Sequence, residues 1–93
     1  MSDLSQYGIH RLKTWPEFYK EVLLGTKTFE IRKNDRAFKV GDLLILQEWS
    51  PERGYTYREE GYFVRYITDW EQKPGYVVMG RLMRGQSMTL TEI

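Results

Sequence analysis

The chain of 93 residues has no cysteine and one histidine, His10. Without cysteine there are no disulfide bonds, thiolate nucleophiles or Cys-type zinc sites. One histidine also argues against a dedicated transition-metal site, so we expect neither a metal nor another cofactor. The longest apolar run, residues 43–46, is far too short to cross a membrane. No signal peptide is recognisable, so these absences predict a cytoplasmic protein without a membrane partner.

The chain also lacks an excess of charge of either sign, because it has 14 basic and 13 acidic residues and a formal net charge of +1. No global positive field attracts nucleic acid, so any such binding surface must be local. Aromatic residues, in contrast, make up 15% of the chain, including seven tyrosines and three tryptophans. This is more than a small core needs, and part of it is available for stacking on a ligand.

The length fits a single domain over residues 1–93, with an ordered core at about 8–84 and ends at 1–6 and 86–93 that we expect to fray. One amphipathic helix is predicted at 15–24. Thr14 precedes it in a capping-box pattern, Pro16 suits its first turn, and Gly25 suits a left-handed end. Helical spacing assigns four side chains to the core: Trp15, Phe18, Val22 and Leu23.

The predicted fold also contains about six short strands. They are expected at 9–12, 28–33, 43–49, 55–57, 62–68 and 76–84. The third is apolar on both faces at first and is therefore placed centrally. The result is an α+β class: a small mixed β-barrel with one helix covering a side. Too few crossover helices are present for a doubly wound parallel sheet.

The chemistry concentrates in residues 25–36, where four positive charges face two negative ones. Strand alternation puts Glu30 and Arg32 on one face, where the guanidinium suits phosphate or carboxylate and the glutamate can order it or accept from a base amine. A solvated strand face carrying a weak ion pair explains the same pattern. Lys27 joins Glu30 only if it lies in the loop before the strand, outside the strand's alternation.

The spacing Gly25-x-Lys27-x-x-Glu30-x-Arg32, after a helix and before the turn at 40–42, resembles the ASCH family of the PUA-like superfamily. The stretch 27–36, with flanking residues, is closest to an ASCH-like family of small bacterial and phage proteins that has no assigned activity. The resemblance covers roughly residues 8–84. It implies a PUA-like barrel whose cleft, lined by this motif, holds RNA or a nucleoside.

Some ASCH relatives are amidohydrolases acting on acylated cytidine, or ribonucleases. Lys27 and Arg32 match the amidohydrolase pattern, but Glu30 stands where its nucleophilic threonine would be. That departure argues against the same mechanism. Glu30 could still act as a general base, with Glu48 as the candidate second acid.

Further candidate ligand contacts lie outside the central motif, and each has a structural alternative. Phosphate contacts are expected from Lys33 and Arg36, beside Lys27, and base-edge contacts from Asn34 or His10, beside Glu30. His10 is equally compatible with a purely structural strand position. An aromatic-basic hairpin contains Tyr55 and Tyr57 between Arg53 and Arg58, and either stacks single-stranded bases or simply covers the sheet.

Three functions remain open at this point. The favoured one is an RNA- or nucleotide-binding domain that uses the cleft built around Lys27, Glu30 and Arg32. The second is a hydrolase on a modified nucleoside, or a weak ribonuclease, with Lys27 and Glu30 as catalytic candidates. The third is a protein-interaction domain that uses the 50–60 hairpin. The particular RNA and the oligomeric state are not specified by the sequence.

Overall fold

The computed structural model describes residues 8–80 and the backbone of 83–84. The described residues form one helix and seven strands, in the order β1 Ile9–Thr14, α1 Pro16–Leu24, β2 Phe29–Lys33, β3 Leu43–Ser50, β4 Gly54–Phe63, β5 Tyr66–Thr68, β6 Tyr76–Gly80 and β7 Met83–Arg84. The predicted fraying at 1–6 and 86–93 concerns residues outside the described ones. The mixed α+β class is confirmed.

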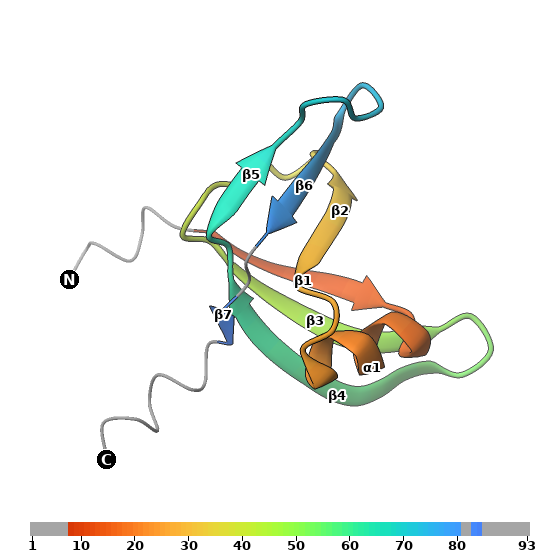
Figure 1. Cartoon of the computed structure of the whole chain (residues 1–93). Coiled ribbons are helices and arrows are strands. Elements are labelled where there is room, and N and C mark those ends of the chain that lie inside the picture. The colour runs from red at the N-terminus through yellow and green to blue at the C-terminus, as the bar shows by residue number, and fades with distance from the viewer. Residues whose placement is uncertain (1–7, 81–82, 85–93) are drawn as a thin grey trace, which may run out of the picture.

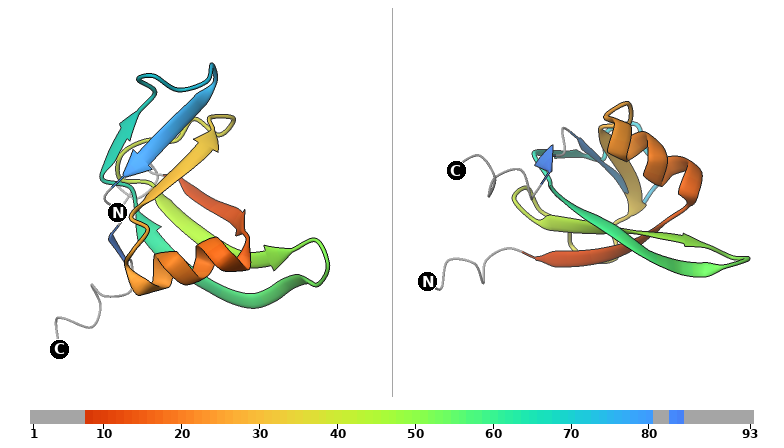
Figure 2. Two further views of the ribbon diagram at one scale, coloured as in Figure 1. Left: turned by 45° about the vertical axis from the view of Figure 1, so that its right-hand side comes forward. Right: turned by 90° about the horizontal axis from the view of Figure 1, so that it is seen from below.

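The strands form two sheets, with orders β1-β3-β4-β7 and β2-β6-β5 (Figure 1). Strands β1 and β3 are parallel, whereas the other pairs are antiparallel. Hydrogen bonding among the described residues gives two sheets and not one closed ring, so the PUA-like barrel stays a prediction. Figure 2 shows the β3–β4 hairpin reaching past the rest of the larger sheet.

Strand β3 is central, as predicted, because it lies between β1 and β4. Its alternate residues Leu44 and Leu46 are fully buried, and they pack with Met79 of the smaller sheet and Val22 of the helix in a single apolar cluster. Sheet-on-sheet burial of this kind is the main stabilising contribution in a chain of this size. The core thus fixes the smaller sheet and the helix against the same strand.

The helix confirms the predicted segment but not its cap or its core face. Trp15 is the N-cap and makes no side-chain cap, while Thr14 ends β1 and donates its hydroxyl to the carbonyl of Leu12. Tyr19 and Val22 are buried, whereas Trp15 and Phe18 are nearly half exposed. Leu23 is 38% exposed as well, so the core assignment of Trp15, Phe18 and Leu23 is wrong, because the nine-residue helix buries only the stripe that carries Tyr19 and Val22.

Two strand predictions also change. The expected edge strand at 55–57 is part of the ten-residue β4, which pairs with β3 along most of its length. The strand expected at 62–68 is split, because the chain leaves the larger sheet after Phe63 and enters the smaller one at Tyr66. The last predicted strand gives β6 and β7, and residues 81–82 between them lie outside the described part.

A buried carboxylate, Asp42, ties the start of β1 to the turn before β3. Its Oδ1 accepts from the Gly8 amide at 2.8 Å, and its Oδ2 accepts from the Lys39 amide at 3.0 Å and from His10 Nε2 at 2.9 Å. Burial alone would raise the pKa of Asp42, but the hydrogen bonds from Gly8, His10 and Lys39 outweigh it and lower that pKa. The side chain of Asp42 is 1% exposed, so this network is shielded from water.

Asp42→Asn is expected to lower the free energy of unfolding by about 1–3 kcal/mol at pH 7, because one amide group cannot accept all three hydrogen bonds. Since the folded pKa is lowered, the carboxylate's contribution is complete above the unfolded value near pH 4 and is lost as the pH falls through the folded pKa. Urea unfolding at pH 7 and at about pH 3 measures both effects.

The matched control is Asp35→Asn, at a carboxylate that is 63% exposed. It should change the free energy of unfolding by less than about 0.5 kcal/mol at either pH. Equal losses in the two variants at pH 7 would contradict the assigned role of Asp42.

Candidate functional site

The helix end and the loop after it place Lys27 outside the alternation of β2. Gly25 adopts a positive φ of 84°, which favours glycine, and its amide donates to the Val22 carbonyl. The amides of Thr26 and Lys27 both donate to the Glu21 carbonyl. This anchored turn precedes β2, so the condition stated for Lys27 to meet Glu30 is fulfilled.

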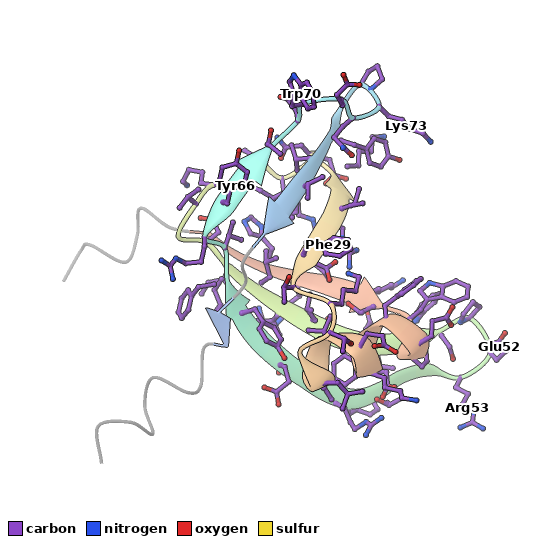
Figure 3. All side chains as sticks on the ribbon, viewed as in Figure 1. Phe29, Glu52, Arg53, Tyr66, Trp70 and Lys73 are labelled. Atoms are coloured by element: carbon purple, nitrogen blue, oxygen red, sulfur yellow. The ribbon has the colours of Figure 1, made fainter. Side chains whose placement is uncertain are left out.

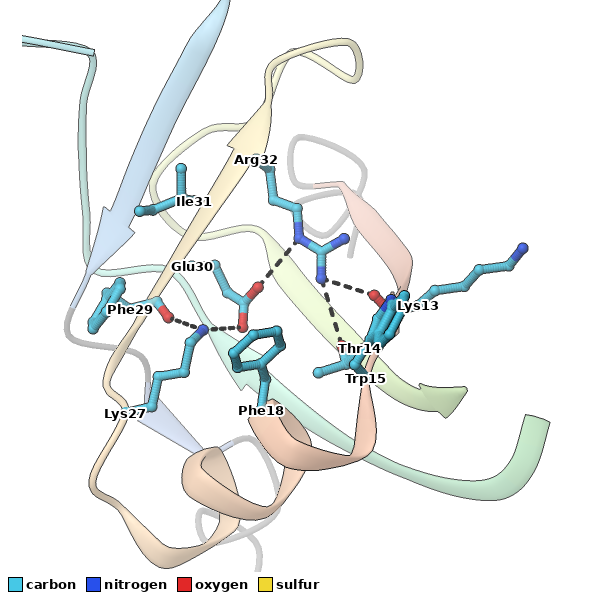
Figure 4. Close-up of a pocket in the computed structure, with 9 residues that line it drawn as sticks. All are labelled: Lys13, Thr14, Trp15, Phe18, Lys27, Phe29, Glu30, Ile31 and Arg32. Atoms are coloured by element: carbon cyan, nitrogen blue, oxygen red, sulfur yellow. Dashed lines mark hydrogen bonds and ion pairs between the residues drawn. The ribbon is translucent and has the colours of Figure 1, made fainter. Parts of the chain in front are cut away.

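Glu30 lies between two cations, as Figure 4 shows. Lys27 Nζ donates to Oε2 of Glu30 at 3.1 Å, and Arg32 Nε donates to Oε1 at 3.2 Å. The side chain of Glu30 is only 4% exposed, compared with 19% for Lys27 and 26% for Arg32. The alternative of a solvated strand face is therefore wrong: this face of β2 is the interior one.

Arg32 also joins β2 to the end of β1. Its Nη2 donates to the Lys13 carbonyl at 3.0 Å and meets the Thr14 hydroxyl at 3.5 Å. Within the described part of the chain, Nη1 makes no hydrogen bond, which leaves two N–H groups for a ligand. Lys27 Nζ donates to the Phe29 carbonyl at 2.7 Å as well as to Glu30, and so retains a third N–H.

These groups form the floor of a hollow of about 460 Å³, here called the motif pocket. Its lining residues are Lys13, Thr14, Trp15, Phe18, Lys27, Phe29, Glu30, Ile31 and Arg32. Three aromatic rings in this set, on Trp15, Phe18 and Phe29, are between 41% and 47% exposed. Lys27 Nζ lies 4.9 Å from the Phe29 ring centroid and 5.9 Å from that of Phe18, so the amine sits between two rings.

The chemistry of the motif pocket suits an anion attached to a flat apolar group. Unused N–H donors on Lys27 and Arg32 can bind phosphate or carboxylate oxygens, and the exposed rings can stack on a base. Glu30 is the only carboxylate among the described residues that line the pocket. No group of three His, Cys, Asp or Glu side chains that could hold a metal occurs in the described residues.

The remaining residues of the 25–36 segment do not line the motif pocket. Asn34 accepts the Phe38 amide through its side-chain oxygen, which stabilises the turn after β2. Arg36 donates to the Arg11 carbonyl at 3.0 Å, and Lys33 is exposed at the end of β2. The expected contacts from Lys33, Asn34 and Arg36 to a ligand in this cleft therefore have no geometric support.

His10 does not line the motif pocket either, and its partner lies elsewhere. Its ring is paired with Asp42 and packs edge-on against Phe38, with centroids 4.7 Å apart. The structural alternative given for His10 is the one that the geometry supports.

The predicted aromatic-basic hairpin lies at a different hollow, here called the hairpin hollow. It has a volume of about 660 Å³ and is lined by Trp15, Pro16, Glu17, Glu48, Ser50, Glu52, Arg53, Thr56 and Arg58. Tyr55 and Tyr57 are exposed on β4 but do not line either hollow described so far. Only Trp15 is shared by the two sets, so the structure does not bring Tyr55 and Tyr57 to the motif.

Glu48, the candidate second acid, is in the hairpin hollow and already has partners. Its Oε1 accepts from Arg58 Nε at 2.9 Å and from the Thr56 hydroxyl at 2.8 Å. The hydrogen bond from Arg58 lowers the pKa of Glu48, more than burial raises it. Glu48 is therefore held ionised in a different hollow and is not paired with Glu30.

The aromatic walls of the motif pocket were not predicted from the sequence patterns. Helical spacing placed Trp15 and Phe18 in the core. Phe29 was missed because the face of β2 opposite to it, which carries the charged Glu30, is the buried one. The available signal was the position of Trp15 directly before Pro16, since an N-cap residue lies at the open end of a helix. Lys13 and Thr14 were not predicted to line the pocket, because they contact Arg32, which is 19 and 18 residues away in the sequence.

The chain belongs to the family described as a domain of unknown function (DUF3850), whose model matches residues 9–81. It is also 35% identical over 86 residues to a protein of Escherichia phage P2 described as "Uncharacterized 12.9 kDa protein in GpA 3'region". This alignment covers 89% of the chain and 75% of the phage protein. The family match includes every residue of the motif pocket, and neither description names a ligand.

Glu30→Gln is expected to lower the free energy of unfolding by about 2–4 kcal/mol, because it leaves two neighbouring cations without their shared buried anion. Lys27→Met should cost about 1 kcal/mol or less, since Glu30 keeps Arg32 and the methionine can pack between the two rings. Chemical denaturation at pH 7 compares the variants. A loss for Lys27→Met as large as that for Glu30→Gln would contradict the central position given to the carboxylate.

Proposed function

We propose that the protein is an RNA- or nucleotide-binding domain and that the motif pocket holds its ligand. The observation that carries this proposal is the floor of the pocket, where buried Glu30 holds Lys27 and Arg32 with N–H donors left over. These donors point to an anionic ligand. The three half-exposed rings beside them point to a planar group on the same ligand.

Charge supports a phosphate as the anionic part. Three cations line the motif pocket against a single carboxylate, and that carboxylate is already bound to two of them. Arginine presents parallel N–H groups that match phosphate oxygens, while lysine contributes a compact charge. In this proposal Lys27 and Arg32 contact phosphate, and Glu30 positions both without touching the ligand.

The size of the pocket and the pattern of the motif agree with this assignment. A hollow of about 460 Å³ lies within the usual range for small-molecule sites. The resemblance of Gly25-x-Lys27-x-x-Glu30-x-Arg32 to ASCH domains implies the same ligand class, and with it a PUA-like barrel. Both belong to the proposal.

A hydrolase acting through the same residues has less support. Both oxygens of Glu30 accept hydrogen bonds from cations, which disfavours removal of a proton from water. The other acid considered, Glu48, is bound to Arg58 in the hairpin hollow. A binding role needs neither group as a base.

Lys27→Met should weaken RNA binding about tenfold or more, because it removes a charge-assisted contact to phosphate from a partly desolvated site. Fluorescence anisotropy of labelled single-stranded, duplex and structured RNAs at low salt measures the affinity. Repeating the titration at rising salt should show a loss of affinity that reflects a few phosphate contacts.

Lys20→Met is the matched control, since Lys20 is exposed on α1 and does not line the motif pocket. It removes the same charge and should leave the affinity within about twofold. No binding of any RNA or nucleotide by the wild-type protein at low salt would refute the proposal, as would equal losses in the two variants.

A further inference from the structure

The smaller sheet has a second face that is directed away from the core. Glu30, Met79 and Ile67 share the inner face because they are cross-strand partners in β2, β6 and β5. The opposite face carries Phe29, Ile31 and Lys33 from β2, whose partners on β6 are Gly80, Val78 and Tyr76. Tyr66 of β5 pairs with Gly80 and lies on this outer face too.

This outer face is unusually apolar for an exposed surface. Phe29 is 41% exposed, Ile31 is 51% exposed and Tyr66 is 59% exposed. Alternation would normally place polar side chains on the outer face of a sheet that is packed on one side. Large exposed apolar patches, in contrast to single exposed apolar residues, mark interaction sites.

A further hollow lies on the same face and shares one lining residue with the motif pocket. It has a volume of about 230 Å³ and is lined by Ile31, Gln72, Lys73 and Tyr76; we call it the Tyr76 hollow. Ile31 also lines the motif pocket, so the two hollows lie on either side of one side chain. Lys73 Nζ lies 5.6 Å from the centroid of the Tyr76 ring, which repeats the combination of cation and ring found at Lys27 and Phe29.

The charges favour an anionic ligand that extends from the motif pocket into the Tyr76 hollow and not into the hairpin hollow. None of the described residues that line the Tyr76 hollow is acidic, and Lys33 is the cross-strand partner of Tyr76. The hairpin hollow, in contrast, contains Glu17, Glu48 and Glu52 against Arg53 and Arg58, so acidic side chains outnumber basic ones there. Figure 3 shows Phe29, Tyr66 and Lys73 distributed over the smaller sheet and its loop, with Glu52 and Arg53 at the far end of the molecule.

We infer that the ligand is single-stranded RNA longer than one nucleotide, and that it runs from the motif pocket across Ile31 into the Tyr76 hollow. This inference rests on the proposed function and specifies its ligand class. One nucleotide occupies the motif pocket, and the next base stacks at Tyr76 with its phosphate near Lys33 and Lys73. A duplex keeps its bases paired and stacked, so it cannot place two of them in separate hollows.

The test compares affinities for ligands of different length. Each of the four nucleoside 5′-monophosphates, a random-sequence RNA hexamer and a twelve-base-pair RNA duplex competes with a labelled hexamer in an anisotropy assay. The hexamer should bind at least about tenfold more tightly than the best monophosphate, because it adds a stacked base and a phosphate contact. The duplex should bind more weakly than the hexamer.

Lys73→Gln should weaken hexamer binding several-fold, lower the salt slope by about 0.7 and leave monophosphate binding unchanged. Arg53→Gln removes the same charge at the distant hairpin and should change neither affinity. Both side chains are exposed, so both variants are expected to fold.

Four results would overturn the inference. Equal affinity for hexamer and monophosphate, equal or tighter binding of the duplex, or equal effects of Lys73→Gln and Arg53→Gln would each exclude the route while leaving the motif pocket as a nucleotide site. If neither the monophosphates nor any of the RNAs bind, the inference and the proposed function both fail.

Discussion

The buried carboxylate of Glu30 is the constraint on which the site depends. It is almost fully enclosed, and a carboxylate in such a position is stable only when its charge is compensated. Lys27 and Arg32 supply that compensation, one from the loop before β2 and one from the same strand. Each cation uses only some of its N–H groups to bind Glu30. The arrangement therefore fixes two positive groups and still leaves N–H donors available in the pocket.

The same ionic cluster adds a polar connection between parts of the fold that the apolar core also joins. Arg32 reaches the end of β1 through the Lys13 carbonyl, and Lys27 follows directly from the helix end. The larger sheet, the helix and the smaller sheet therefore all meet at the motif pocket. An arrangement that is held from three sides is preorganised, which reduces the ordering cost of binding.

Sequence patterns were sufficient for the helix, the central position of β3 and the shared strand face of Glu30 and Arg32, whereas they left open whether Lys27 joins Glu30. These depend on local signals: Pro16 and Gly25 at the helix ends, an apolar run, and a spacing that resembles a known motif. Which face of β2 is buried could not be predicted in this way. Alternation shows that Phe29 and Ile31 lie opposite Glu30, but it does not show which set is buried, and here the charged set is inside.

Other features depended on contacts between distant segments. The length of β4 is set by its pairing with β3, and the tyrosine-rich stretch alone did not show it. The exposure of Trp15 and Phe18 depends on how much of a short helix the sheet can cover. The partners of His10 and Glu48 are 32 and 10 residues away in the chain, and no local pattern identifies them.

The most direct measurement of the central claim is a ¹H–¹⁵N NMR titration that follows the Arg32 Nε–H, the Trp15 indole N–H and the backbone amides as single-stranded RNA is added. If Glu30 holds a nucleotide-binding pair of cations, the Arg32 and Trp15 signals should shift together with the amides of residues 27–32. Shifts confined to the 50–60 hairpin, with the Arg32 and Trp15 signals unchanged, would contradict it.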